Sequence, residues 1–416
     1  MLDPEHARSP ADSAAMAATR YGYFVNWDDN SFSSLKRNAS ALDVVIVEWL
    51  HSGGPSGALT RSDPGKEALV RKWARSNAPA LKLYPLVNNF NAEAKGWDGE
   101  ATAQMLASKQ ARATFADELY RYVIQGGFSG VVLDFESIPA RAHADYVTLV
   151  REVAAMFRAY QVKLLVAVPA SDPDFDYAKL AEAADALIVM TYDEHNEQGA
   201  PGPLAGQGWF EAKLDERLKD VDGKKLILSI GAYGYDWAES GSAREISVQE
   251  AWELLDESKA ALRFDPASLN PTFSYIDDVE NKRHQVWFLD GVTAYNQISA
   301  ALATRPAGLA LWRLGTEDPS IWAAFGRNRK PDEQALAAAR KLQSGYDLLY
   351  KGVGEVLSVT GEQQQGAREI GFDAAHNLIT HQEISAFPQS ATVTRWGART
   401  DKMIALTFDD GPDRIF

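Results

Sequence analysis

The feature that most restricts the fold of this 416-residue chain is a regular alternation of short apolar runs with longer helix-like segments. Eight such runs occur, at 21–27, 43–50, 81–89, 130–136, 163–170, 186–193, 225–235 and 307–315. They are almost continuously hydrophobic, which is typical of parallel strands covered on both faces. Eight repeats of strand and helix predict an α/β fold, a (β/α)8 TIM barrel over about residues 20–328.

The segment between the seventh and eighth runs is too long for one helix. Residues 240–300 contain a helical stretch at 247–262 and strand-like stretches at 272–277 and 284–290. We expect a small α+β insertion between strands 7 and 8. The alternative is that one of these stretches is a barrel strand and that the count of eight is off by one.

The segments outside the barrel differ in composition. Residues 1–19 are rich in Ala, Ser and Pro, and we expect a flexible leader without the apolar core of an export signal. We expect residues 329–398 to form one amphipathic helix, over 331–351, followed by a mixed linker.

The charge balance limits the partners of the chain. Its 42 Lys and Arg against 57 Asp and Glu give a formal charge of −15, whereas nucleic acids and anionic membranes select basic surfaces. We therefore expect no nucleic-acid partner, and a neutral or cationic ligand instead. No apolar run approaches the roughly 18 residues of a membrane span. The absence of cysteine excludes disulfides and thiolate metal sites.

Two carboxylates interrupt the apolar run within GFSGVVLDFESI, residues 127–138: Asp134 and Glu136. Residues two apart in a strand point to the same face, and in barrels of this class the C-terminal strand ends carry the functional groups. Two neighbouring carboxyls cannot easily both ionise, so one remains a proton donor beside a charged partner. Cleavage of a glycosidic bond requires such a pair.

This stretch resembles the signature of family 18 glycoside hydrolases, Asp-x-x-Asp-x-Asp-x-Glu. Glu136 matches the catalytic acid and Asp134 the last aspartate of the signature, whereas Ser129 and Val132 stand at its first two aspartates. The loss of the middle aspartate puts chitinase activity proper in doubt. One alternative is therefore a non-catalytic glycan-binding barrel, although lectin-like relatives usually lose the glutamate that is present here.

Further motifs resemble the same family in the same order. Met190-Thr191-Tyr192-Asp193 matches the motif that ends the sixth strand, and Trp312 matches the tryptophan that forms the floor of the sugar site. Residues 230–237 and 286–288 resemble the subgroup that includes spore-cortex N-acetylglucosaminidases.

The resemblance implies retaining, substrate-assisted hydrolysis of β-linked N-acetylglucosamine polymers outside the cytoplasm, with no cofactor for the barrel. The 2-acetamido oxygen of the substrate would attack the anomeric carbon, while Glu136 protonates the leaving oxygen and then activates water. Asp134 would orient the acetamido group, Tyr192 would hydrogen-bond to it, and Asp193 would bind substrate or support the acid. The linkage, β-1,4 or β-1,6, and the choice between internal and terminal cleavage stay open.

Aromatic and polar residues near strand ends are further candidates for substrate binding. Sugar faces stack on exposed aromatic rings, but any one tryptophan is equally a candidate for the core. The substrate-binding candidates are Trp27, Glu48, Met190, Trp237 and Trp312. Trp49 and Trp209 either bind substrate as well or pack in the core. Glu48 either binds substrate or pairs with an arginine. Asn88 and Asn89 either bind sugar hydroxyls or form a turn, and His195 is expected to form hydrogen bonds at the rim.

A separate motif lies at 405–413, ALTFDDGPD, within the segment 399–416. It resembles the opening of NodB-homology polysaccharide deacetylases, in which Asp409 would be the base and Asp410 a ligand of a zinc-like divalent metal. The histidine ligands of that family are missing here, so we expect a truncated domain start that holds no metal and has no deacetylase activity. The combination resembles multidomain bacterial envelope enzymes. A second alternative is that the natural protein acts mainly as a deacetylase.

Overall fold

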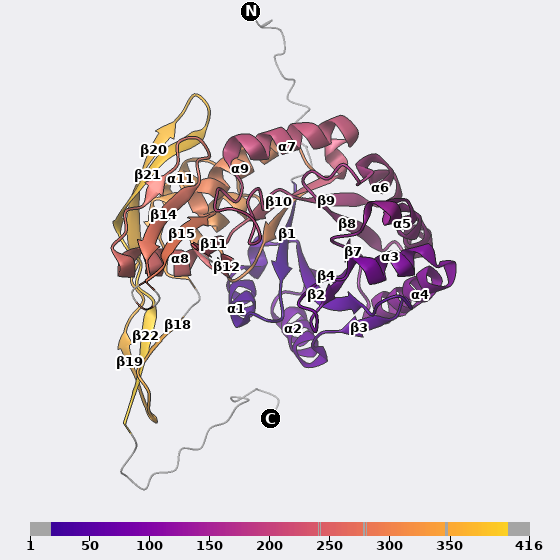
Figure 1. Ribbon diagram of the computed structural model, residues 1–416, viewed down its shortest axis with the longest axis horizontal. Coiled ribbons are helices and arrows are strands. Elements are labelled where there is room, and N and C mark those ends of the chain that lie inside the picture. The colour runs from indigo at the N-terminus through magenta and orange to yellow at the C-terminus, as the bar shows by residue number, and fades with distance from the viewer. Residues whose placement is uncertain are drawn as a thin grey trace, which may run out of the picture.

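The computed structural model describes residues 18–397, except 240, 242, 278, 280, 346 and 347. Its centre is a closed ring of eight parallel strands in the order β1-β16-β10-β9-β8-β7-β4-β2, with β2 paired again to β1 (Figure 1). The strands are β1 (Thr19–Phe24), β2 (Val44–Ser52), β4 (Lys82–Asn88), β7 (Gly130–Asp134), β8 (Lys163–Pro169), β9 (Ala186–Met190), β10 (Leu226–Gly231) and β16 (Gly308–Trp312). Each predicted run overlaps one of these strands, so the barrel is confirmed and the alternative strand count is wrong.

Helices surround this ring on its outer face (Figure 1). They are α1 (Asp29–Asn38), α2 (Pro64–Asn77), α3 (Gly99–Ala107), α4 (Lys109–Gly126), α5 (His143–Arg158), α6 (Tyr177–Ala183), α7 (Gln207–Asp220), α9 (Gly291–Ala303) and α10 (Trp322–Phe325). Aspartates start several of them: Asp28, Asp63 and Asp98 each accept a hydrogen bond from a backbone N–H of the first turn. Short strands β3 (Leu59–Arg61), β5 (Phe90–Asn91) and β6 (Gly96–Trp97) lie in the loops that follow β2 and β4.

Side chains of the barrel strands alternate between two cores, as a period of two requires. Val131 and Leu133 of β7 pack outward against the helices, whereas Val132 packs into the barrel interior with Ile46 of β2 and Leu86 of β4. Continuing each strand by two residues places Asp134, Glu48 and Asn88 on the inward face at the C-terminal mouth. The alternation thus brings polar residues from three strands into one layer.

The insertion is an antiparallel sheet that leaves the barrel after β10. Its strands β11 (Gly234–Ala238), β12 (Ala243–Ile246), β13 (Arg263–Phe264), β14 (Pro271–Ile276) and β15 (Arg283–Phe288) pair in the order β12-β11-β15-β14-β13. Helix α8 (Val248–Ser258), which begins with a capping box at Ser247 and Glu250, packs on the sheet. The expected limits of 240–300 need correction: the run 225–235 contains the whole of β10 and the start of β11, and 291–303 is a barrel helix.

The segment expected to be a helix and linker also differs from prediction. Helix α11 (Glu333–Ala339) covers only part of 331–351, because the chain then forms β17 (Lys341–Leu342), which pairs with β20 (Gly366–Asp373). Strand β21 (Leu378–Ala386) completes a hairpin with β20 beside the insertion, and β18 (Leu348–Lys351), β22 (Ala391–Trp396) and β19 (Val356–Gly361) form a sheet that extends away from the barrel (Figure 1). Asp409 and Asp410 lie outside the described residues.

Candidate active site at the barrel mouth

Strand β7 delivers the two predicted acids to the mouth. Asp134 is its last residue and is 6% exposed, and its Oδ1 atom accepts no hydrogen bond within the described protein. Glu136 follows two residues later and is half-buried. A buried carboxylate oxygen without a protein partner costs free energy unless another group, such as a ligand, approaches it. Asp134 therefore offers a hydrogen-bond acceptor to a ligand, and beside it the Glu136 carboxyl is partly exposed to solvent.

The backbone of Glu136 is held by Asn89 from the end of β4. The Asn89 Oδ1 atom accepts a hydrogen bond from the Glu136 N–H at 2.9 Å, and Nδ2 donates to the Glu136 carbonyl at 2.8 Å. Nδ2 also donates to Thr102 Oγ1 of α3 at 3.1 Å. At the same turn, α3 approaches so closely that a Cβ on Gly99 would lie 1.9 Å from the Ser137 carbonyl oxygen. Asn89 is thus committed to positioning Glu136 rather than free to bind a sugar.

We expect Asn89→Ala to lower kcat by up to about 10²-fold, because a small displacement of an acid from its reacting atom has effects of that size. KM should change little, since Asn89 is buried. The measurement is steady-state hydrolysis together with thermal unfolding. Asn77→Ala, at the exposed end of α2, is the control. A kcat for Asn89→Ala equal to that of the control would remove the positioning role.

The environment of these carboxyls disfavours ionisation. Burial raises the pKa of Asp134 to about 7. Burial, and then the charges of Asp134, Asp193 and Glu48, raise the pKa of Glu136 well above its usual value. These surroundings favour the protonated form of Glu136, the form that a general acid needs.

Glu48, predicted to bind substrate or an arginine, lies below the rim and is 7% exposed. Its Oε1 atom accepts a hydrogen bond from Asn88 Nδ2 at 2.7 Å, and Arg313 is near enough to act on its charge. Asn88 Oδ1 in turn contacts His51 Nδ1 at 2.6 Å. Both asparagines after the third barrel strand are therefore buried parts of the site's framework.

Aromatic rings form the opposite side of the mouth. Trp312 at the end of β16 is stacked against Tyr192 with ring centroids 6.4 Å apart. The rings of Trp312 and Tyr23 meet edge to face, with centroids 5.1 Å apart. Met190, at the end of β9, packs partly buried in the same cluster. The predicted floor residue Trp312 thus keeps partial exposure and faces the barrel axis.

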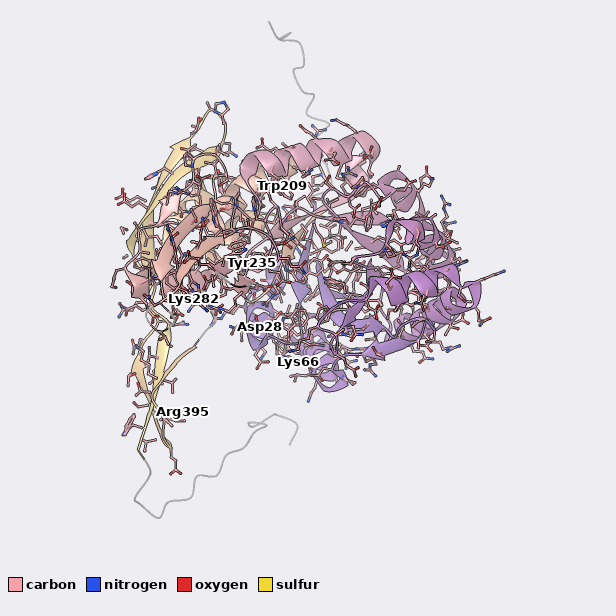
Figure 2. All side chains as sticks on the ribbon, in the orientation of Figure 1. Asp28, Lys66, Trp209, Tyr235, Lys282 and Arg395 are labelled. Atoms are coloured by element: carbon pink, nitrogen blue, oxygen red, sulfur yellow. The ribbon has the colours of Figure 1, made fainter. Side chains whose placement is uncertain are left out.

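The insertion supplies one wall of the mouth. Asp193 is exposed at the rim, where its Oδ1 atom accepts hydrogen bonds from Tyr233 Oη at 2.5 Å and from Tyr235 Oη at 3.2 Å. Arg313 joins this wall to the barrel, with ion pairs to Asp28 at 2.5 Å and to Glu245 of β12 at 3.0 Å. Asp28 and Tyr235 lie where the insertion meets the barrel (Figure 2).

The tryptophans divide into exposed and buried groups. Trp27 is 62% exposed just beyond β1, whereas Trp237 is 3% exposed and packs against Tyr235, so it offers no free face to a sugar. Trp49 belongs to the core, and Trp209 packs partly buried against it. His195 Nδ1 contacts the Ala200 carbonyl at 3.0 Å, a hydrogen bond at the rim as expected.

Sequence reasoning missed three residues of the site as individual candidates. Tyr23 is a barrel-interior residue, Tyr233 binds Asp193, and Arg313 bridges two elements. Tyr23 lies within the first apolar run, one residue before the end of β1, and this position is a signal that could identify it. The roles of Tyr233 and Arg313 depend on where the insertion folds back, which no local pattern encodes.

Two hollows elsewhere are poorer candidates for the active site. Both lie at the N-terminal ends of the barrel strands, one lined by Lys163 and Asp185 and the other by Lys82 and Ser129. Functional groups of this fold gather at the opposite end, where the acid pair is found. Among the described residues, no group of three His, Asp or Glu side chains is placed to hold a metal ion.

A carboxyl pair ending a strand of a (β/α)8 barrel, opposite an aromatic floor, is typical of the glycosidase class. The chain belongs to a particular family of that class, the glycosyl hydrolases of family 18, whose model matches residues 19–318.

Individual relatives agree with this membership. The chain is 29% identical over 333 residues to the uncharacterized glycosylase YvbX of Bacillus subtilis (strain 168), covering 76% of this chain and 93% of that protein. It is 24% identical over 246 residues to a cortical fragment-lytic enzyme of the same organism, covering 56% of this chain and 57% of that protein.

Solved structures with the same fold include a chitinase and a spore enzyme. A chitinase from Chromobacterium violaceum ATCC 12472 has a TM-score of 0.68 and 26% identity, covering 77% of this chain and 99% of that one. The spore cortex-lytic enzyme SleL of Bacillus megaterium QM B1551 has a TM-score of 0.65 and 21% identity, covering 73% of this chain and 72% of that one.

Proposed function

We propose that this protein hydrolyses β-linked N-acetylglucosamine polymers with retention of configuration, using the 2-acetamido group of the substrate as nucleophile. The observation that carries the proposal is the pairing of Asp134, whose buried Oδ1 atom has no protein partner among the described residues, with the half-buried Glu136, whose pKa is raised by burial and by neighbouring carboxyls. Asp134 can accept a hydrogen bond from the substrate, and Glu136 can donate a proton at the boundary with solvent.

The proposed reaction has two balanced steps. The acetamido oxygen forms a bond to the anomeric carbon while the glycosidic C–O bond breaks and Glu136 gives its proton to the leaving oxygen. The resulting oxazolinium ion is then opened by water, whose proton returns to Glu136. Asp134 accepts the acetamido N–H and stabilises the positive charge. Because the substrate supplies the nucleophile, a second carboxylate nucleophile is unnecessary.

Residues across the mouth would hold the reacting sugar. Tyr192 Oη is assigned to the acetamido oxygen, and burial first, with nearby charges of Asp134 and Asp193, raises the pKa of Tyr192 so that it stays a donor. Trp312 would form the floor under the sugar ring. Asp193, held by two tyrosine hydroxyls, would bind a substrate hydroxyl or support Glu136.

Trp27 is proposed as an outer platform for the polymer. We expect Trp27→Ala to raise KM about 3- to 10-fold, the worth of one aromatic stacking contact, with no loss of stability. Trp237→Ala is the matched comparison, because its buried ring should instead cost about 3–5 kcal/mol of unfolding free energy. Steady-state kinetics and urea unfolding of both variants test whether Trp27 contributes to substrate binding and Trp237 to stability. An unchanged KM for Trp27→Ala would exclude the ring from substrate binding.

The experiment that tests the proposed function is product mass spectrometry with β-1,4- and β-1,6-linked N-acetylglucosamine oligomers, using the parent and Glu136→Gln. Shorter fragments from the parent alone would establish hydrolysis and identify the linkage. The lengths of the fragments would separate internal from terminal cleavage. Intact oligomers that bind to both proteins would overturn the proposal and favour the glycan-binding barrel.

The names of similar proteins support the proposed substrate and a place of action outside the cytoplasm. A similar fold occurs in a class V chitinase from Nicotiana tobaccum in complex with NAG4, with a TM-score of 0.63 and 16% identity. The enzymes described as cortex-lytic act, by name, on the spore cortex. We propose that this chain likewise acts on an N-acetylglucosamine polymer and does so outside the cytoplasm.

No helix among the described residues is long and apolar enough to cross a membrane. The deacetylase resemblance at 405–413 remains a sequence-based expectation.

A further inference from the structure

A cluster that the proposed reaction does not use lies directly beneath the mouth. It consists of Glu48 on β2, Asn88 on β4 and Asp134 on β7, three adjacent strands of the barrel. Asn88 is the register partner of Asp134, and its Nδ2 atom donates to Glu48 Oε1 at 2.7 Å. All three side chains continue the inward-facing series of their strands, so Glu48 and Asp134 lie buried on the two strands that flank β4, near enough for their charges to act on each other.

The orientation of the Asn88 amide is determined by its other contact. The Phe90 N–H donates to Asn88 Oδ1 at 3.2 Å, so the NH2 group must be the end that faces Glu48. One oxygen of Glu48 therefore accepts this bond, which leaves the other free to carry a proton.

Little positive charge is available to this layer. The groups that act on the two carboxyls are Tyr23 from β1, Tyr192 from β9, Tyr146 from α5, Glu136 after β7, Arg313 after β16 and, through Asn88, His51. Of these, Arg313 carries a fixed positive charge, and it is bound to Asp28 and Glu245. Val132, the inward residue below Asp134, is apolar.

Two carboxyls in a buried layer with so little compensating charge cannot both ionise, and they titrate as a pair. Burial, and then the charge of Asp134, raise the pKa of Glu48 to about 8, despite the hydrogen bond from Asn88. The corresponding pKa of Asp134 is about 7, raised by burial. Burial and the charge of Asp134 favour the protonated form of Glu48, whereas the hydrogen bond from Asn88 and the charge of Arg313 favour its ionised form, so the two carboxyls share one proton.

We propose that Glu48 is a positioning residue that shares one proton with Asp134 in a buried carboxyl pair, so that Asp134 can be ionised beneath the substrate. Its role in turnover rests on the proposed function, because only an ionised Asp134 both accepts the acetamido N–H and faces the oxazolinium charge. The existence of the pair does not depend on hydrolysis. The two claims can be tested separately.

The pair is tested by carbon-13 NMR titration of carboxyl-labelled protein between about pH 5 and 10, a range above ordinary carboxyl pKa values. We expect one resonance with a midpoint near 8 that is absent from Glu48→Gln. In Asp134→Asn the same resonance should titrate about one pH unit lower or more, because its like-charged neighbour is gone. A Glu48 midpoint near 4, or one that Asp134→Asn leaves unchanged, would overturn the pair. Thermal unfolding checks that each variant is folded, and Glu93→Gln, on the exposed β5–β6 turn, is the control.

The role in turnover is tested by comparing Glu48→Gln with Glu48→Leu. Gln has the shape and neutrality of a protonated Glu48, so kcat should remain within about 10-fold of the parent, whereas Leu should lower it about 10²-fold with little change in KM. Equal losses for Gln and Leu would overturn the requirement for a neutral hydrogen-bonding group. If the parent hydrolyses nothing, the proposed function fails, while the titration still decides whether the pair exists.

Discussion

In the Glu136→Gln variant, kcat is expected to fall by about 10²- to 10⁴-fold, the usual contribution of a positioned general acid. Gln keeps the size of the side chain and leaves the backbone bonds to Asn89 in place, so oligomer binding should persist. The loss should therefore appear in kcat and not in KM. The measurement is initial-rate kinetics with a defined oligomer, paired with calorimetric binding. Glu93→Gln makes the same chemical change at an exposed rim position and should hydrolyse at the parental rate.

The pH dependence of the parent supplies an independent check on this assignment. The acid must be protonated, and the raised pKa of Glu136 means that activity is retained through neutral pH and lost as pH rises through that pKa. Asp134 must be ionised, so activity should also fall as pH drops below about 7. A bell-shaped profile of kcat/KM with an acid limb near 7 is expected. Full activity at pH 5 would contradict the assigned state of Asp134.

Arg368→Met is expected to destabilise the protein by about 3–5 kcal/mol, the cost of breaking a buried ion pair. Arg368, on β20, has no exposed side-chain surface, and it binds Asp290 at 2.7 Å and Asp318 at 2.8 Å. Asp290 also caps α9, accepting hydrogen bonds from the N–H groups of Val292 and Thr293. Removing the arginine would leave two carboxylates buried without their cation. Urea unfolding should detect the loss.

Two comparisons separate this charge effect from lost packing. Arg151→Met removes one member of an exposed pair, 3.9 Å from Glu182, and should cost less than about 1 kcal/mol. Adding D290N and D318N to R368M should recover part of the stability, because the uncompensated charges are then gone. If R368M unfolds at the parental urea concentration, the β20–β21 hairpin is not part of the cooperative unit that contains the barrel.

The barrel could be predicted from the chain because its signal is local and repeated. Each apolar run is short and bounded by polar segments, and a strand buried on both faces needs no knowledge of its neighbours to be identified. Asp134 and Glu136 could likewise be placed at the mouth, since a strand's direction and end determine where its last residues lie. The insertion sheet was found in part, from the runs that became β14 and β15.

Other features depended on contacts between distant segments. Trp27 is exposed and Trp237 is buried, because Trp237 lies on β11 of the insertion and packs there with Tyr235 and Trp287. The nearness of Glu48 to Asp134 requires the register of three strands. Residues 366–370 do alternate between buried and exposed positions, but nearby glycines and polar residues obscure that pattern in the sequence.

The attachment of the insertion has a kinetic consequence. The wall that carries Tyr233 and Tyr235 is continuous with β10 at one end and with α9 at the other, and Arg313 ties its β12 edge to Asp28. A wall restrained at three points has no free end about which to swing shut. The wall of the mouth should thus be in place before the polymer arrives, so binding need not wait for a closing movement. We expect kcat to be insensitive to solvent viscosity, because bond cleavage rather than product release should then be the rate-limiting step.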